Sequence, residues 1–367
     1  MIYKPFKELQ LSTLGLGCMR FPVIDGKSDQ IDETETAKLV AYAMEQGLNY
    51  FDTAWPYHGG MSETVMGRLL SQYPRDSYYL ATKFPGFTRD YFEKKEEIFE
   101  KQLEKCQVEY FDFYLCHNVC ERNIEDFLDP EIGLMAYLVE QKKAGRIRHL
   151  GFSTHGSLET MERFIQAWQP HIEFCQIQLN WLDWIHQNAE AKVALLQKYD
   201  LPVWVMEPVR GGGLLRLSRK DKALLAALRP EETVAGWCFR FLQSVPGVTM
   251  VLSGMSDYAQ LSENIRTFSE EKPLNEEEKQ ALTRIAEGIL AQKSMLCTNC
   301  KYCEPECPQG LGIPKLILQY NQFNSDGIKP ETQTDPADCV GCGSCEKVCP
   351  QKIRISEIMA DFAAKLQ

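Results

Sequence analysis

The sequence of 367 residues has no apolar run long enough for a membrane span and no excess of positive charge. A transmembrane helix needs about 20 consecutive apolar residues, so we expect no membrane partner. Lys and Arg number 40 against 51 Asp and Glu, which gives a net charge of −11. An acidic chain repels a phosphate backbone, so we expect no nucleic acid partner. The opening residues, MIYKP, hold no apolar stretch of a secretory signal, and we expect a cytoplasmic protein.

The sequence also lacks the glycine pattern of an open dinucleotide-binding sheet. No G-x-G-x-x-G follows the first predicted strand, which argues against a doubly wound fold. Eight apolar segments instead alternate with segments of helical periodicity. This alternation predicts an α/β fold, the (β/α)8 TIM barrel, with a hairpin over residues 3–12 that closes its bottom. The predicted strands are residues 13–18, 48–52, 79–83, 111–116, 147–152, 174–178, 203–206 and 248–252.

Helical periodicity places helices between these strands. Residues 33–46 and 90–106 are each predicted to form one helix, and a charge-rich helix is predicted over residues 275–290. Ser62 precedes an apolar-periodic segment that reaches residue 70. Its hydroxyl is of the type that accepts from an N–H group of the first turn, so we expect Ser62 to cap this helix.

The cysteines are distributed unevenly. Six of the 14 are scattered through the first 240 residues, and we expect them to be reduced and mostly buried. The other eight form two equal groups in the last fifth of the chain. Such grouping indicates ligands rather than disulfides in a protein of this size.

Four polar residues lie at the ends of three successive predicted strands. Asp52 ends one strand and Tyr57 follows it, Lys83 ends the next, and His117 follows the third. Chemistry in parallel α/β proteins is done at this end of the strands. The alternative to a shared site is that these are four unrelated polar residues at strand ends. This alternative is favoured for each residue taken singly, but not for all four together.

The four types form a coherent acid/base set. Tyr57 is a poor acid at neutral pH unless its pKa, ordinarily about 10, is lowered, and a nearby Lys83 ammonium favours the phenolate. Asp52 would hold Lys83, and a neutral His117 would donate a hydrogen bond to a carbonyl oxygen. Such a site protonates a ketone or aldehyde oxygen while a hydride reaches the carbon.

The two cysteine groups follow the spacing C-x2-C-x2-C-x3-C-P twice. This is the spacing of bacterial two-cluster ferredoxins. Thiolates select iron–sulfur clusters or zinc, but zinc modules usually use separated ligand pairs. The candidate ligands are Cys297, Cys300, Cys303, Cys307, Cys339, Cys342, Cys345 and Cys349.

Several motifs together resemble the aldo/keto reductase family over residues 2–290. They are Gly47-x-Asn49-x-Phe51-Asp52-Thr53-Ala54-x-x-Tyr57, Ser62-Glu63-x-x-x-Gly67 and Ala81-Thr82-Lys83. The resemblance implies reversible hydride transfer between a nicotinamide and a small-molecule carbonyl or alcohol substrate. It also implies a barrel domain over residues 1–292. The cysteine spacing, which resembles that of bacterial two-cluster ferredoxins, implies that residues 293–367 form a ferredoxin-like domain that binds two [4Fe-4S] clusters.

The same resemblance implies where the nicotinamide cofactor binds. NADP(H) is the habitual cofactor of the family, but Gly254 and Gln260 stand where the family often has the Lys and Arg that pair with the 2′-phosphate, so NAD(H) also stays open. Thr154 stands where Asn is usual beside the carboxamide. By resemblance the carboxamide is held by Ser153 and Gln176, the pyrophosphate by Glu207, Pro208, Gly211 and Gly212, and the adenine end by Glu263 and Asn264.

The ferredoxin resemblance implies how the cysteines divide, because the fourth cysteine of each group ligates the other cluster. One set is Cys297, Cys300, Cys303 and Cys349, and the other is Cys339, Cys342, Cys345 and Cys307. The clusters have either a structural role or an electron-transfer role with a redox partner protein. An alternative function is an electron-carrier or redox-sensing subunit, whose barrel binds a nicotinamide without turnover.

Overall fold

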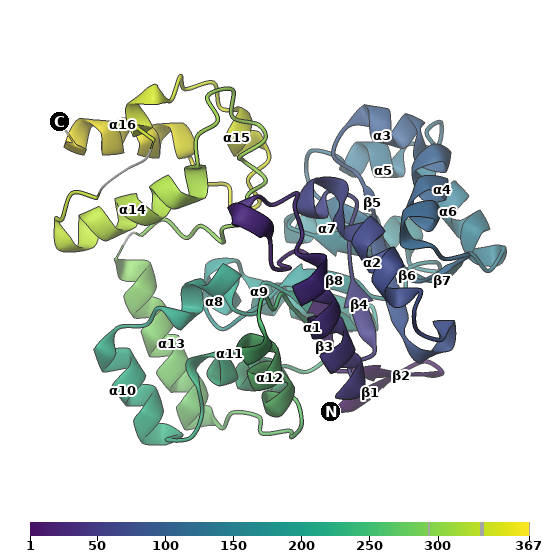
Figure 1. The fold of residues 1–367 in the computed structure, drawn as a ribbon, viewed down its shortest axis with the longest axis horizontal. Helices are drawn as coiled ribbons and strands as arrows, with labels where there is room; N and C mark the ends of the chain where they lie inside the picture. The colour runs from purple at the N-terminus through teal and green to yellow at the C-terminus, as the bar shows by residue number, and fades with distance from the viewer. Residues whose placement is uncertain (293, 331–333, 367) are drawn as a thin grey trace. The chain divides into compact units, whose positions relative to one another are not determined.

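Eight parallel strands close into a barrel in the computed structural model, which describes residues 1–292, 294–330 and 334–366. The strands are β3 (Leu14–Gly17), β4 (Tyr50–Asp52), β5 (Tyr79–Pro85), β6 (Phe111–Val119), β7 (Ile147–Thr154), β8 (Cys175–Gln178), β9 (Val203–Met206) and β10 (Val248–Ser253). They pair in chain order, and β10 pairs with β3 to close the ring. The (β/α)8 barrel predicted from the sequence is thereby confirmed (Figure 1).

Helices follow the strands as the alternation predicts, with some differences in number. The predicted helix over 90–106 is divided at Lys94 into two. The helices α5 (Ile124–Leu128), α8 (Asp183–His186) and α10 (Arg219–Leu228) were not predicted from the sequence. The helices up to residue 267 are α1 (Glu33–Glu45), α2 (Ser62–Leu70), α3 (Arg89–Glu93), α4 (Lys95–Cys106), α5 (Ile124–Leu128), α6 (Leu134–Lys143), α7 (Leu158–Trp168), α8 (Asp183–His186), α9 (Ala189–Lys198), α10 (Arg219–Leu228), α11 (Val234–Gln243) and α12 (Tyr258–Thr267).

Local capping explains where several helices begin. The Asp32 carboxylate accepts from the N–H of Glu35 at α1, and Asp257 caps α12 in the same way. The expectation for Ser62 is wrong, because Met61 occupies the N-cap position of α2 without a side-chain bond. The Ser62 hydroxyl instead donates to the carbonyl of Cys18 at 2.9 Å.

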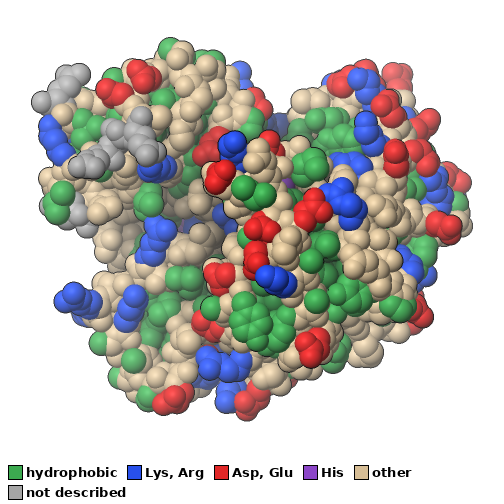
Figure 2. Space-filling model, in the orientation of Figure 1, with side chains coloured by type: hydrophobic (Ala, Val, Ile, Leu, Met, Phe, Trp, Pro, Cys, Tyr) green, Lys and Arg blue, Asp and Glu red, His purple; other side chains and the backbone are tan. Residues whose placement is uncertain are grey.

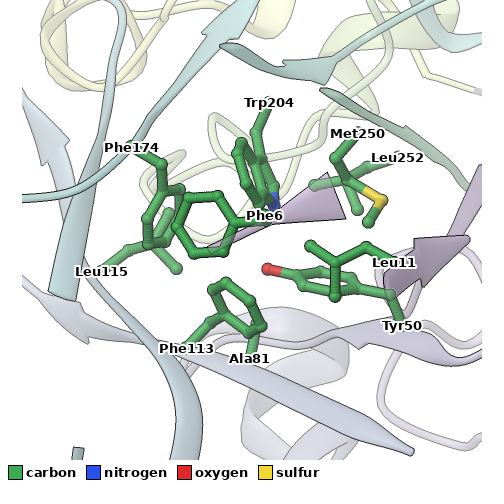
Figure 3. Close-up of a cluster of buried hydrophobic side chains, with 10 residues drawn as sticks. All are labelled: Phe6, Leu11, Tyr50, Ala81, Phe113, Leu115, Phe174, Trp204, Met250 and Leu252. Carbon is green, nitrogen blue, oxygen red and sulfur yellow. The ribbon is translucent and has the colours of Figure 1, made fainter. Parts of the chain in front are cut away.

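The predicted hairpin, β1 (Tyr3–Phe6) and β2 (Leu9–Ser12), contributes apolar residues to the floor of the barrel. Phe6 packs edge-on against Trp204 and tilted against Phe113, with ring centroids 5.1 and 5.6 Å apart. Figure 3 shows these side chains converging from several strands. The whole floor cluster is Phe6, Leu11, Tyr50, Ala81, Phe113, Leu115, Phe174, Trp204, Met250 and Leu252.

By internal contacts the chain forms two compact units, Met1–Pro208 with Ala235–Glu276, and Val209–Val234 with Glu277–Gln367. The second unit contains α13 (Glu276–Ala291) almost entirely, α14 (Ile313–Asp326), α15 (Ser344–Lys347) and α16 (Ile355–Leu366). Its apolar centre is formed by residues of α14 and α16 together with two cysteines, Cys303 and Cys345. The predicted boundary at residues 292 and 293 stays a prediction.

Figure 2 shows how charged side chains are distributed on one face of the described surface. On the face shown in Figure 2, acidic and basic side chains are interspersed, and no wide basic patch is visible among the residues described there. Across the described ranges, no helix is both long and apolar enough to span a bilayer.

The barrel floor makes stability depend on pH. His149 is 4% exposed, beside Phe6, Glu173 and Glu8, and its burial lowers the pKa of its imidazole to about 4 against the attraction of Glu8. Lys7, Lys142 and Arg148 lower this pKa further. Because the unfolded chain protonates His149 near its ordinary pKa, stability falls as pH drops from about 6.5 to about 4.

We predict that in His149→Gln the free energy of unfolding falls less steeply as the pH is lowered, by at most about 1 kcal/mol per pH unit. Urea unfolding at pH 7 and pH 5 measures it, with His171→Gln at a partly exposed position as the control. Equal pH dependence in wild type and His149→Gln would contradict the prediction.

Candidate active site and cysteine cavities

Every second side chain along a strand faces the same side of the sheet. The residues of the barrel floor therefore indicate which later residues of each strand also face the barrel interior. Tyr50 and Ala81 belong to the barrel floor, so Asp52 and Lys83, two residues further along, face the same interior nearer the carboxyl ends. His117 follows Leu115 of β6 in the same way. The structure therefore brings together the strand-end residues that the sequence predicted.

Lys83 is the centre of this group and is fully buried. Its Nζ donates to Asp52 Oδ1 at 2.6 Å and to the Thr53 carbonyl at 2.7 Å, and it lies 3.3 Å from the Tyr57 hydroxyl. Burial raises the pKa of Asp52, and the charge and hydrogen bond of Lys83 oppose that shift. Asp52 and the Thr53 carbonyl therefore direct the ammonium group, which also reaches the phenol.

Tyr57 opens a short turn, η2 (Tyr57–Gly60), just after β4. The pKa of Tyr57 is raised in this structure, and not lowered overall as expected beside the Lys83 ammonium. Burial raises the pKa of Tyr57 well above its usual value, and the charges of Asp52, Cys18 and Glu207 add to this effect. The phenol thus keeps its proton at neutral pH, as a proton donor requires.

The His117 ring faces Tyr57 edge-on, with ring centroids 6.1 Å apart. Burial lowers the pKa of His117 well below its usual value, and the positive charge of Lys83 lowers it further. The imidazole is therefore neutral and retains one N–H to donate. Its Nδ1 has no hydrogen-bond partner among the described residues.

The predicted carboxamide ligands lie on neighbouring strands. Ser153 and Gln176 are paired in the register of β7 and β8, and Gln176 is two residues beyond the floor residue Phe174. The Ser153 hydroxyl accepts from the Asn118 N–H at 3.0 Å, and the buried Oε1 of Gln176 meets no donor within the described part of the chain. Gly151 lies two residues before Ser153 on β7, where a Cβ would fall 2.5 Å from the Phe174 ring.

The loop after β9 adopts left-handed backbone conformations. Glu207 has φ +56°, and its carbonyl accepts from Asn180 Nδ2 at 3.0 Å. Pro208 follows it, and Gly211 and Gly212 have φ +58° and +85° in η4 (Arg210–Leu215). The glycines adopt this conformation without the cost a side chain brings.

At the predicted adenine end, Asn264 is buried in α12 and donates to the Ser253 hydroxyl at 3.2 Å. The preceding Glu263 is partly exposed. The amide of Gln260 bonds to Asp257 and the Ser256 N–H, and the Arg20 side chain packs against Gly254.

A buried network behind Lys83 was not predicted from the sequence. The fully buried Glu63 accepts from Thr82 Oγ1, Gln102 Nε2 and Lys105 Nζ at 2.7, 2.6 and 2.7 Å. Gln102 also donates to the Lys83 carbonyl at 3.0 Å, so the network reaches the backbone of the central residue. The signal was available, since Ser62-Glu63 is part of the motif and residues 102 and 105 are one helical turn apart.

The eight grouped cysteines line two cavities. Each cavity takes three cysteines from one group and the fourth from the other, in the division that the ferredoxin resemblance implies. The first cavity is lined by Cys297, Cys300, Cys303 and Cys349, and the second by Cys307, Cys339, Cys342 and Cys345. Within the described ranges, no three His, Cys, Asp or Glu side chains gather closely enough to hold one metal ion.

The two cysteine loops repeat the same backbone. Positive φ angles occur at Asn299 and Lys301 in the first loop and at Gly341 and Gly343, the matching positions of the second. A third matched pair is Gly310 and Lys352, each three residues after the last cysteine of its group. At each matched pair of positions, one loop thus has a glycine where the other has a residue with a side chain.

The scattered cysteines are free and buried, as expected. Trp181 is buried and donates to the Cys238 sulfur at 3.2 Å, which indicates a packing role. Trp55 is partly exposed and lies under Lys105 Nζ, 4.5 Å from its ring centroid.

Sequence relatives were found in plants and bacteria. "Probable aldo-keto reductase 1" of Glycine max is 28% identical over 211 residues, which are 55% of this chain and 57% of that protein. "Uncharacterized oxidoreductase YqkF" of Bacillus subtilis is 25% identical over 305 residues, covering 75% of this chain and 92% of that protein. The match thus spans little more than half of the soybean protein.

Solved structures show the same barrel. An aldo-keto reductase of Bacillus halodurans in its holo form has a TM-score of 0.62 and 25% identity, covering 78% of this chain and 96% of that one. A thermostable aldo-keto reductase solved with the inhibitor epalrestat has a TM-score of 0.63 and 24% identity, covering 78% of this chain and all of that one.

Two family models match the sequence in adjacent regions. The 4Fe-4S dicluster domain matches residues 296–353, which contain all eight grouped cysteines. The Aldo/keto reductase family matches residues 13–287, which is most of the chain and contains the strand-end residues. The protein therefore belongs to the aldo/keto reductase family and carries a 4Fe-4S dicluster domain at its C-terminal side.

Proposed function

We propose that the protein is an NAD(P)(H)-dependent oxidoreductase that interconverts a small-molecule carbonyl and the corresponding alcohol. The observation that carries the proposal is the buried hydrogen-bonded series Asp52–Lys83–Tyr57 at the carboxyl end of the barrel, with the neutral His117 ring beside the phenol. Membership of an oxidoreductase family supports it.

The four side chains divide the acid/base work. A reduced nicotinamide, when bound, would supply the hydride for the new C–H bond at the carbonyl carbon. The His117 N–H orients the carbonyl oxygen, and the Tyr57 hydroxyl gives that oxygen its proton. Lys83 stabilises the phenolate left behind, since an adjacent positive charge favours the ionised phenol. Asp52 orients Lys83 through its 2.6 Å bond.

The hydrogen-bonding groups of β7 and β8 suit the nicotinamide carboxamide. Ser153 keeps a hydroxyl proton to donate to the amide oxygen, and Gln176 Oε1 accepts from the amide nitrogen. We propose that Glu207, Pro208, Gly211 and Gly212 hold the pyrophosphate and that Glu263 and Asn264 hold the adenine end. NADP(H) and NAD(H) are both consistent with this segment, where Gly254 and Gln260 carry no charge.

The cysteine cavities fit the second cofactor. Four thiols around one cavity are the donor set of a [4Fe-4S] cluster, and the two cavities provide it twice. We propose that each cavity holds one such cluster and that residues 293–367 form the ferredoxin-like domain. A reducing compartment such as the cytoplasm suits these thiols and the six free buried cysteines.

We predict that Tyr57→Phe lowers the carbonyl reductase rate by about 10²–10⁴-fold. The ring and its packing remain, so nicotinamide affinity should change little. Anaerobic assays of a panel of aldehydes and ketones, with NADPH and NADH followed by absorbance, measure both quantities. Turnover near that of the wild type would refute the assignment of Tyr57 as the proton donor.

We predict that Glu63→Gln destabilises the protein by about 3 kcal/mol, because Lys105 loses the partner of a buried ion pair. The rate should fall as well, since the network supports the Lys83 backbone, while nucleotide affinity stays unchanged. Urea unfolding and single-turnover kinetics measure these effects. Glu33→Gln removes a half-exposed pair with Arg68 and should cost less than about 1 kcal/mol. An equal loss of unfolding free energy in Glu63→Gln and Glu33→Gln would show that the buried network stabilises the protein no more than the surface pair does.

We predict about eight irons and about eight acid-labile sulfides per chain after anaerobic purification, the content of two four-iron clusters. Cys349→Ser should damage the cluster of the first cavity, and Cys307→Ser that of the second. Iron and sulfide analysis with EPR of the dithionite-reduced variants tests the division. Zinc without sulfide would refute the cluster assignment.

A further inference from the structure

The segment that follows β9 belongs by its contacts to the cysteine-rich unit. Val209–Val234 forms one compact unit with Glu277–Gln367. Its first helical turn, η4 (Arg210–Leu215), begins at Arg210 and contains Gly211 and Gly212. The glycine loop proposed above for the pyrophosphate therefore shares a unit with the two cysteine cavities.

Arg210 connects this loop to the first cavity. Its Nη2 donates to the carbonyl of Leu296 at 2.6 Å and to Gln351 Oε1 at 3.0 Å. Leu296 directly precedes Cys297, and Gln351 lines the first cavity two residues after Cys349. One guanidinium thus binds both chain segments that supply cysteines to that cavity.

The backbone conformation and the burial of Arg210 are both unfavourable, and the hydrogen bonds to Leu296 and Gln351 offset this cost. The Arg210 φ of +48° lies in the left-handed region, which is unfavourable for a non-glycine residue. The side chain is also 3% exposed, and a buried guanidinium is stable only with hydrogen-bond acceptors or charge partners around it. The acceptors at Leu296 and Gln351 are in place only when both cysteine segments are folded.

Metal binding commonly supplies the folding energy of such segments, because the site does not exist in the unfolded chain. We propose that Arg210 couples assembly of the first cluster to nucleotide binding by the Gly211–Gly212 loop. This inference rests on the proposed function of that loop. By linkage the coupling is reciprocal, so bound nucleotide also stabilises the assembled cluster.

The two cavities provide an internal comparison. Arg210 bonds to the segments of the first cavity, whereas the second is lined by Cys307 and the Cys339–Cys345 loop. Loss of the second cluster alone, in Cys342→Ser, should therefore weaken nucleotide binding less than loss of the first, in Cys300→Ser. Iron analysis and EPR identify which cluster each variant retains.

The test is a thermodynamic cycle on the full-length protein under anaerobic conditions. NADPH affinity is measured by fluorescence titration for cluster-loaded and chelator-stripped protein, each as wild type and as Arg210→Gln. We expect stripping and Arg210→Gln each to weaken binding about tenfold, and the substitution to have little further effect on stripped protein. Arg216→Gln, an exposed cation of the same loop, should leave the affinity within about twofold.

The cycle separates coupling from direct contact. If Arg210→Gln weakens binding equally in loaded and stripped protein, Arg210 acts on the nucleotide itself and the proposal fails. If stripping leaves the affinity unchanged, the proposal also fails. If loaded wild type binds neither NADPH nor NADH, the proposed function fails instead.

A second readout needs no nucleotide. Trypsin should cut at Arg216 and Arg219 faster in stripped wild type and in loaded Arg210→Gln than in loaded wild type, because the loop loses its anchor. The assay therefore tests the anchor even if the nucleotide assignment is wrong. Equal cleavage in all three samples would overturn the proposal.

Discussion

The alternation of side chains along the barrel strands is the constraint on which the site depends. Phe6 and its neighbours fill the floor, and this packing fixes which residues of each strand point inward. Since a shift by one residue would turn every side chain to the other face, the floor also determines that Asp52, Lys83 and His117 meet at the carboxyl end. The hairpin supplies the inward ring of Phe6 and so contributes to a site whose residues it does not contain.

A buried ammonium group is stable only because it is surrounded by acceptors. Lys83 has a carboxylate, a backbone carbonyl and a phenol around its Nζ, and its own carbonyl is held by Gln102. Gln102 in turn is held by Glu63, whose charge is balanced by Lys105. The Asp52–Lys83 pair and the Glu63–Lys105 pair are therefore connected through Gln102 into one buried polar network. In such a network the hydrogen bonds of each member depend on those of the others.

The sequence predicted the barrel and the strand-end residues because each depends on local spacing, whereas the division of the cysteines followed from the ferredoxin resemblance. Period two along strands and the cysteine intervals are visible in one dimension. The contacts of Glu63 and Arg210 were not predicted, since they join segments 39 and 86 residues apart and leave no periodic signal. The pKa of Tyr57 was also misjudged, because a neighbouring cation can be inferred from a motif but the depth of burial cannot.

The left-handed residues at matching positions of the two cysteine loops affect which groups of the backbone face a negative charge. A left-handed residue next to right-handed ones turns successive N–H groups toward one side and forms a small anion-binding concavity. The Asn299 N–H, 3.4 Å from the Cys297 sulfur, is one such amide. The positive φ angles recur at Gly341 and Gly343, so the two loops turn at the same places although one carries side chains there and the other carries glycines.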